Sequence, residues 1–262
     1  MIGLFLGDKQ LPLEILKSLK KKKINYFIID LSKNNKFKKE KNCYFINIGK
    51  FGEILKLINL KKCKKVLFAG NIIKPSISKL KFDIKGIYYL PRIIKASKLG
   101  DAAILKELIK ILSENKIKVV KLNTFNPELT LQKGDYTKIK PSKIDILNIQ
   151  KGIKILKSLN SYNHVQAIVI NENGHFTLEK RKGTKQLLKK IKITKTGNIL
   201  IKIPKLKQDL RADLPTIGFD TIKDCVKSNV KGIVIKSNQN IFLNQKESIK
   251  FANKNNLFLT VI

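Results

Sequence analysis

The chain has 262 residues, a hydrophobic share of 43% and a formal net charge of +36. Its length allows one large hydrophobic core or two modest ones, and its hydrophobic share is ordinary for a folded protein. The charge suggests nucleic acid or an anionic membrane, but the only arginines are Arg92, Arg181 and Arg211, and nucleic-acid surfaces depend on arginine. We therefore expect no specific nucleic-acid partner, and lysines on solvated faces that favour an acidic membrane leaflet.

Cysteine and histidine are too few and too scattered for a soft-metal site. Cys43, Cys63 and Cys225 form no C-x-x-C pair, which argues against zinc or a disulfide framework and favours a reduced, cytosolic compartment. His164 and His175 cannot make a histidine cage, so any metal would be a hard cation on oxygen ligands. The chain start lacks signal-peptide features and no apolar run approaches a membrane span, so we expect a soluble protein, at most peripheral.

The first half alternates apolar runs with helical spacing, which predicts βαβ units and a parallel sheet. Asp30 ends the second run, where dinucleotide-binding folds keep a ribose-binding acid. However, Gly7 is followed by Asp8-Lys9-Gln10 instead of a glycine fingerprint, so a nicotinamide or flavin enzyme is disfavoured. Strands are predicted at 2–6, 26–31, 44–48, 66–69 and 117–122, and helices at 11–19, 51–60, 91–98 and from the Asp101 N-cap through 112.

Two polar residues of this half are candidates for ligand contact. Asn71 follows Gly70 at the end of the fourth strand, where open α/β sheets bind ligands, and a simple turn is an equally good interpretation. Asp101 is a natural N-cap, and its carboxylate could alternatively point into the cleft above the sheet.

The periodicity is lost between residues 124 and 141 and returns in a second α/β pattern. We divide the chain into an N-terminal domain (1–125), a linker (126–141) and a C-terminal domain (142–262). Ser142 and Asp145 predict a capping box, and Asn173-Gly174 predicts a hairpin. The helix at 142–159 should turn Ile146, Ile149, Ile153 and Leu156 inward. Further strands are predicted at 165–170, 176–179, 198–203, 232–235, 240–243 and 257–261, and helices at 186–191, 220–229 (capped by Asp220) and 247–255.

Polar residues gather near two breaks in this half. Gly183-Thr184 opens a helix and suits either a phosphate or a plain cap. Lys202 and Lys205 lie near the end of the strand at 198–203 and could offset phosphate charge.

The segment 211–218 is predicted to be a shaped loop, because Pro215 fixes one backbone angle and Gly218 frees another. In an extended loop Arg211 and Asp213 would point the same way. One could hold a phosphate and the other a metal ion or a water, although a turn with a surface ion pair is the plainer interpretation.

Four segments together resemble one family almost from end to end. The chain resembles the metal-dependent UDP-2,3-diacylglucosamine diphosphatase of lipid A biosynthesis, of the LpxI type. The matching segments are Ile48-Gly49-Lys50-Phe51-Gly52 with Phe68-Ala69-Gly70-Asn71, then Leu90-Pro91 through Gly100-Asp101, Glu128-Leu129-Thr130-Leu131, and Arg211-Ala212-Asp213-Leu214-Pro215-Thr216-Ile217-Gly218.

The resemblance implies a Rossmann-like parallel-sheet N-terminal domain, a mixed α/β C-terminal domain and a site in the groove between them. It implies hydrolysis of the nucleotide-linked diacyl sugar to UMP and 2,3-diacylglucosamine 1-phosphate, with Mg²⁺. The family's key aspartate falls on Asp213, as catalytic residue and metal ligand, and Arg211 is the second catalytic candidate. The substrate-binding candidates are Asn71, Asp101, Gly183, Thr184, Lys202, Gln208 and Thr216.

The resemblance also sets the expected partners and the alternative function. We expect a cytoplasmic protein at the inner membrane surface, with a homodimer left open. Ala102 and Lys185 stand where the family has acids, and the first glycine-rich loop is replaced. The alternative is therefore a catalytically weakened homologue that binds lipid or other polyanions.

Overall fold

The computed structural model describes residues 1–72, 77–159, 165–206 and 208–262, so His164 lies outside the described residues. Two compact units make up the chain. The first comprises Met1–Pro127 with Arg211–Asp213, and the second comprises Glu128–Leu210 with Leu214–Ile262. Within the described residues, no helix has the length and apolar character needed to cross a membrane.

The first unit contains a five-stranded sheet in the order β3-β2-β1-β4-β5, with every pair parallel. Apolar runs buried on both faces produce this kind of sheet. The order reverses between β1 and β4, so the switch point of the sheet lies there. The strands are β1 (Ile2–Leu6), β2 (Tyr26–Asp30), β3 (Cys43–Tyr44), β4 (Lys65–Ala69) and β5 (Lys118–Val119).

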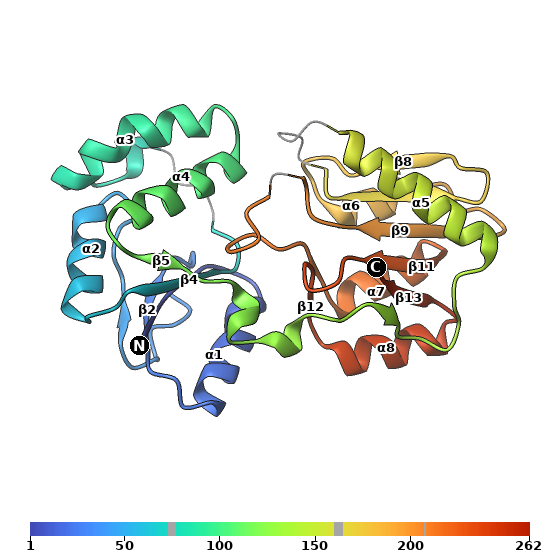
Figure 1. The fold of residues 1–262 in the computed structure, drawn as a ribbon, viewed down its shortest axis with the longest axis horizontal. Helices are drawn as coiled ribbons and strands as arrows, with labels where there is room; N and C mark the ends of the chain where they lie inside the picture. Colours follow the sequence, from blue (N-terminus) through green and yellow to red (C-terminus); the bar gives the residue numbers. More distant parts are fainter. Residues whose placement is uncertain (73–76, 160–164, 207) are drawn as a thin grey trace. The chain divides into compact units, whose positions relative to one another are not determined.

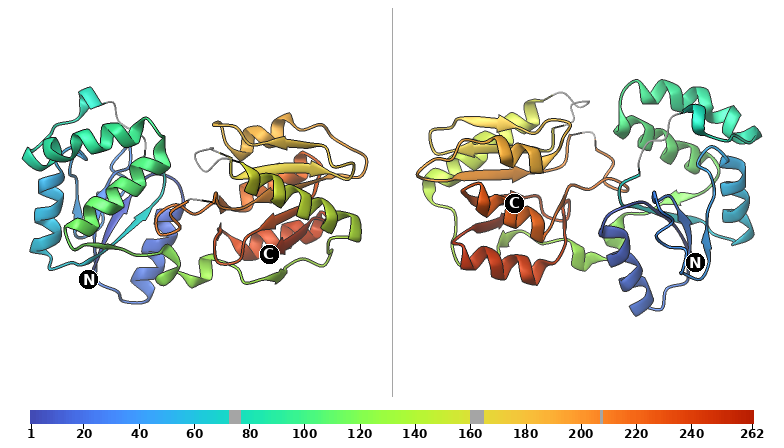
Figure 2. Two further views of the ribbon diagram at one scale, coloured as in Figure 1. Left: turned by 45° about the horizontal axis from the view of Figure 1, so that its top comes forward. Right: turned by 180° about the vertical axis from the view of Figure 1, so that it is seen from behind.

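Helices cover both faces of this sheet (Figures 1 and 2). One face packs on α2 (Phe51–Leu60) and α4 (Asp101–Glu114) through a cluster that includes Phe27 and Ile54. The opposite face is covered by α1 (Leu11–Lys21). The remaining elements are α3 (Ile84–Ser97) and the short 3-10 turns η1 (Ile77–Lys79), η2 (Leu122–Thr124) and η3 (Pro127–Leu129), the last running into the second unit.

One carboxylate, that of Asp83, caps two helices. Its Oδ1 accepts from the Gly86 N–H of α3 at 2.7 Å, and its Oδ2 accepts from the Glu53 N–H of α2 at 2.9 Å. A Cβ at Gly86 would collide with the carbonyl oxygen of Gly49, so the two helix starts can approach this closely only with glycine there. Burial tends to raise the pKa of Asp83, but the surrounding backbone N–H groups outweigh it and lower that pKa.

We expect Asp83→Ala to lower the free energy of unfolding of the first unit by about 2 kcal/mol, because two caps are lost at about 1 kcal/mol each. Asp83→Asn, which keeps one acceptor oxygen, should lose about half as much. A lowered pKa gives stability that is present above the unfolded value and is lost as the pH falls through the folded one. The difference between wild type and Asp83→Ala in urea titrations should therefore shrink below about pH 4. Equal stability at pH 7 would contradict the double cap.

Three predicted elements in the first unit had wrong boundaries, and one of them is the strand predicted at 117–122, which is only Lys118–Val119. The strand predicted at 44–48 is only Cys43–Tyr44, because β3 is an edge strand with two residues paired to β2. The helix predicted from Pro91 begins at Ile84, since the Asp83 cap sets its start and Pro91 lies inside it, where its ring is exposed.

The second unit contains a mixed six-stranded sheet in the order β6-β13-β11-β9-β7-β8. Its centre, β13-β11-β9, is parallel, while β6, β7 and β8 join as antiparallel strands. The strands are β6 (Gly134–Asp135), β7 (Ala167–Asn171), β8 (Phe176–Leu178), β9 (Asn198–Lys202), β11 (Val230–Ile235) and β13 (Phe258–Val261), and a separate parallel pair is formed by β10 (Thr216–Ile217) and β12 (Ile241–Phe242).

Helices pack on both faces of this sheet as well. The helix α5 (Lys143–Ser158) covers the face that carries Ile168 and Ile201. The other face carries Val169 and Leu200 and packs against α6 (Thr184–Lys190), α7 (Phe219–Lys227) and α8 (Gln245–Lys254). The predicted α/β class, with a parallel and then a mixed sheet, is confirmed.

Local signals in the second unit were mostly right. The Ser142–Asp145 capping box is present, and β7 and β8 form the hairpin around Asn173-Gly174. Ile146 was expected to point inward but is 45% exposed. The reason is Gly152, whose missing side chain lets α5 sit against Ile201 and sets which face of the helix is buried.

Candidate functional site

The carboxyl end of β9 carries a chain of three polar side chains from three elements. Lys202 is the last residue of β9, Thr184 is the first of α6, and Glu179 follows β8. The Lys202 Nζ donates to the Thr184 Oγ1 at 2.8 Å, and that hydroxyl lies 2.6 Å from the Glu179 Oε1. Because a carboxylate only accepts, the Thr184 hydroxyl donates to Glu179 and accepts from Lys202. The Thr184 hydroxyl thus links the lysine ammonium to the Glu179 carboxylate.

Glu179 is the buried member of these three hydrogen-bonded side chains, with 7% of its surface exposed. Its second oxygen, Oε2, accepts from the Gln166 N–H at 3.1 Å. A buried carboxylate is tolerated only when it is hydrogen-bonded and close to positive charge, and here both conditions hold. Glu179 therefore ties the start of α6 and the end of β9 to the chain entering β7.

Gln208 belongs to the same network. Its Oε1 accepts from the Lys205 N–H at 3.0 Å and from the Gln166 Nε2 at 3.1 Å. Two bonds to one amide oxygen fix the loop that follows β9 against Gln166. The structure thereby brings together three predicted residues, Thr184, Lys202 and Gln208, through two that were not predicted, Glu179 and Gln166.

Asn240 fixes the end of β9 from the other side. It is 1% exposed, its Nδ2 donates to the Lys202 carbonyl at 3.0 Å, and its Oδ1 accepts from the Lys236 N–H at 2.9 Å. Gly183, the residue before α6, has a φ of 80°, and apart from its chain neighbours no described residue has an atom within 4 Å of where its Cβ would be. The backbone beside Thr184 is therefore set by conformation and is open on that side.

Leu210 to Ala212 form a turn, which was the plainer interpretation of this segment. The alternation that would align Arg211 with Asp213 in an extended loop does not apply to a turn. Arg211 is exposed and Asp213 is partly buried. Ala212 packs against the apolar cluster of the first unit, with which residues 211–213 are grouped.

The rest of this motif is built into the second unit. Pro215 is buried, and its carbonyl accepts from the Ile241 N–H at 2.9 Å. Thr216 opens β10, and its hydroxyl donates to the Leu214 carbonyl at 3.2 Å. Gly218 is the N-cap of α7, so the predicted cap, Asp220, is instead the second residue of the helix, in its first turn, and is exposed.

In the first unit, Asn71 lies at the switch point of the sheet. It pairs with Asp8 through two backbone bonds, Asp8 N to Asn71 O at 2.7 Å and Asn71 N to Asp8 O at 3.0 Å. A Cβ on Gly7 would meet the Asn71 carbonyl, so glycine permits this close approach. The Asn71 side chain is exposed, as a ligand contact would require.

The acids of the first unit have local structural roles. Asp30 accepts from the Ser32 N–H, the Ser32 hydroxyl and the Phe37 N–H, so both its oxygens organise its own loop. Asp8 pairs with Lys36 at 3.0 Å, and that lysine lowers the pKa of the carboxyl. Asp101 was predicted as an N-cap, but Gly100 holds that position with a φ of 106°, and Asp101 is the exposed first residue of α4.

Magnesium can be tested against the donors that the chain offers. Among the described residues, no group of three or more His, Cys, Asp or Glu side chains could hold a metal. Mg²⁺ seldom uses such a cage, because it binds one or two carboxylates together with substrate phosphates. One carboxylate together with substrate phosphates would therefore be a sufficient set of donors for Mg²⁺.

Sequence comparisons agree with one family over both halves. The model of the LpxI N-terminal domain matches residues 1–129, and that of the LpxI C-terminal domain matches residues 132–260. A Caulobacter vibrioides protein named UDP-2,3-diacylglucosamine pyrophosphatase LpxI is 27% identical over 223 residues, which is 82% of this chain and 80% of that protein.

Proposed function

Because the chain belongs to the LpxI family, we propose that it hydrolyses the pyrophosphate of UDP-2,3-diacylglucosamine to UMP and 2,3-diacylglucosamine 1-phosphate, in lipid A biosynthesis. The observation that carries the proposal is the match of both family domains, in order, across nearly the whole chain. The relative from Caulobacter vibrioides bears the corresponding name. The network at the end of β9 contributes one ammonium group, that of Lys202, which could contact a substrate phosphate.

Three residues of this chain could offset the negative charge of the phosphates or accept the proton of the attacking water. Water adds to one phosphorus, the bridging P–O bond breaks, and the leaving phosphate takes the electron pair. Lys202, held by Thr184 and Glu179, offsets negative charge without having to reorganise. Arg211 can grip a phosphate with two parallel N–H groups. Asp213 can hold the attacking water and take up its proton.

When magnesium is bound, it would neutralise negative charge on the phosphate oxygens and make the phosphorus more electrophilic. Asp213 is the residue we propose to hold it. Because the chain offers one carboxylate and the substrate supplies the other donors, we expect metal affinity to be much higher with substrate than without it.

The proposal is tested by mass spectrometry of the purified protein with the diacylated nucleotide sugar. We expect UMP and the diacylglucosamine 1-phosphate in equal amounts in the presence of Mg²⁺. Adding EDTA should stop their release, and excess Mg²⁺ should restore it. A folded protein that binds the substrate but releases no UMP would instead favour a weakened, lipid-binding homologue.

A further inference from the structure

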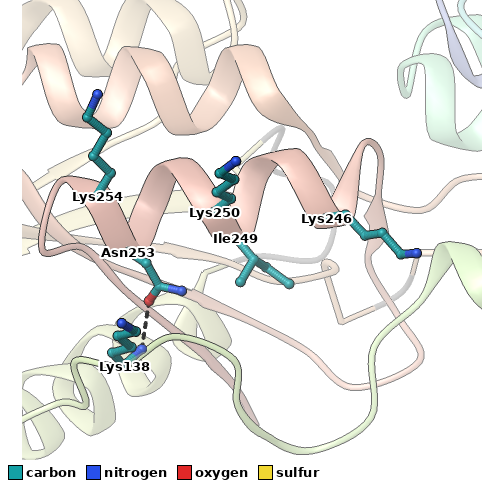
Figure 3. Close-up of a pocket in the computed structure, with 6 residues that line it drawn as sticks. All are labelled: Lys138, Lys246, Ile249, Lys250, Asn253 and Lys254. Atoms are coloured by element: carbon teal, nitrogen blue, oxygen red, sulfur yellow. Dashed lines mark hydrogen bonds between the residues drawn. The ribbon is translucent and has the colours of Figure 1, made fainter.

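A basic groove of about 600 Å³ lies along α8 in the second unit (Figure 3). Its described lining includes no carboxylate. One wall is closed by the backbone N–H of Lys138, which donates to the Asn253 Oδ1 at 2.7 Å. The lining residues are Lys138, Lys246, Ile249, Lys250, Asn253 and Lys254.

Three of these lysines lie close enough along α8 to repel one another. Lys246, Lys250 and Lys254 are exposed and four residues apart, so they project from one face of α8. Like charges at this spacing repel one another, and Glu247 in the first turn and the last-turn position of Lys254 offset only part of that repulsion. A bound anion removes that repulsion.

Ile249 adds an apolar element between the lysines. It is partly buried and packs against the core cluster beneath α8, while it also lines the groove. An apolar floor bordered by ammonium groups matches the boundary of a bilayer, where phosphate headgroups lie above acyl chains.

We propose that this groove docks the protein on an anionic bilayer, with lipid phosphate headgroups as its ligands. The inference rests on the proposed function, because a diacylated substrate is held in a membrane and the enzyme must reach it there. Lysines near an acidic leaflet each add about 1 kcal/mol of attraction.

The test compares two triple variants of the full chain in vesicle co-sedimentation. Lys246→Gln/Lys250→Gln/Lys254→Gln neutralises the groove. Lys143→Gln/Lys154→Gln/Lys157→Gln removes the same charge from exposed positions of α5, on the opposite face of the same sheet. On phosphatidylglycerol vesicles we expect the groove variant to bind about 100-fold more weakly, and the α5 variant to stay within about 3-fold of wild type. Phosphatidylcholine vesicles should bind none of the three.

Equal losses in the two variants would overturn the proposal, because attraction would then come from lysines spread over the whole surface. Unchanged binding of the groove variant, or equal binding to phosphatidylcholine, would overturn it as well. Turnover of detergent-dispersed substrate is measured separately and should be unchanged in both variants. If no protein turns over substrate but the groove variant alone loses vesicle binding, the docking inference stands and the proposed hydrolysis falls.

Discussion

Asp213→Asn should lower kcat for UMP release about 1,000-fold, within the range that positioned acid–base groups contribute. Asparagine keeps the size and one oxygen but loses the charge, so it neither takes a proton from water nor holds magnesium well. Thermal unfolding should be unchanged, since the side chain is only partly buried. If Asp213 holds the metal, raising Mg²⁺ should recover part of the lost rate, whereas a carboxylate that only orients water would show no such recovery.

Asp220→Asn is the matched control for this substitution. Asp220 lies seven residues further on, its side chain is 97% exposed, and its nearest cation, Lys223, is 4.0 Å away. Activity within about 2-fold of wild type is expected, because exposed charges of this kind contribute little. Wild-type kcat in Asp213→Asn would remove this residue from the mechanism.

Glu179→Gln should lower kcat/KM about 10-fold to 100-fold, the value of one or two hydrogen bonds to a buried charge. The carboxylate accepts from both the Thr184 hydroxyl and the Gln166 N–H. A glutamine offers one oxygen and one NH₂ group, so one of these donors loses its acceptor. The Lys202 ammonium then loses its support, and we expect most of the effect in KM, because a lysine binds substrate phosphate before the transition state.

Substitutions of Thr184 test whether Glu179 acts on Lys202 through the Thr184 hydroxyl. Thr184→Val removes the hydroxyl at nearly constant shape and should cost as much as Glu179→Gln, whereas Thr184→Ser should be close to wild type. In the double variant the two losses should overlap instead of adding, because each substitution breaks the same series of hydrogen bonds between Lys202 and Glu179. Full additivity would mean that Glu179 supports the fold and not Lys202.

The sequence predicted elements well where their signals are local. Ser142 with Asp145 and Asn173-Gly174 fix their own neighbourhoods, and the structure has the capping box and the hairpin. It failed where a distant partner decides, as at Ile146, whose exposure follows from the packing of Gly152 against Ile201. The start of α3 was missed although its signal is local: Asp83 caps the Gly86 N–H three residues on, and Pro91 was mistaken for the helix start.

The candidate site shows the same division. The family resemblance is confirmed by both domain models. It did not identify Glu179, which matters because it is buried and accepts a hydrogen bond from Thr184. A carboxylate four residues before Gly183-Thr184 was the available signal, but nothing local marks it as buried. Lys202 meets Thr184 across 18 positions, and Gln166 meets Gln208 across 42. The roles of Asp213 and Arg211 stay predictions.

Residues 211–213 complete the first unit although the chain reaches them only after most of the second. The first unit is therefore not encoded by one uninterrupted stretch. A gene rearrangement that carried away codons 1–127 alone would leave behind residues 211–213, of which Ala212 packs against the apolar cluster of the first unit. A first unit without these residues would expose apolar surface and tend to aggregate. We therefore expect that recombination has transferred the two halves of the gene together.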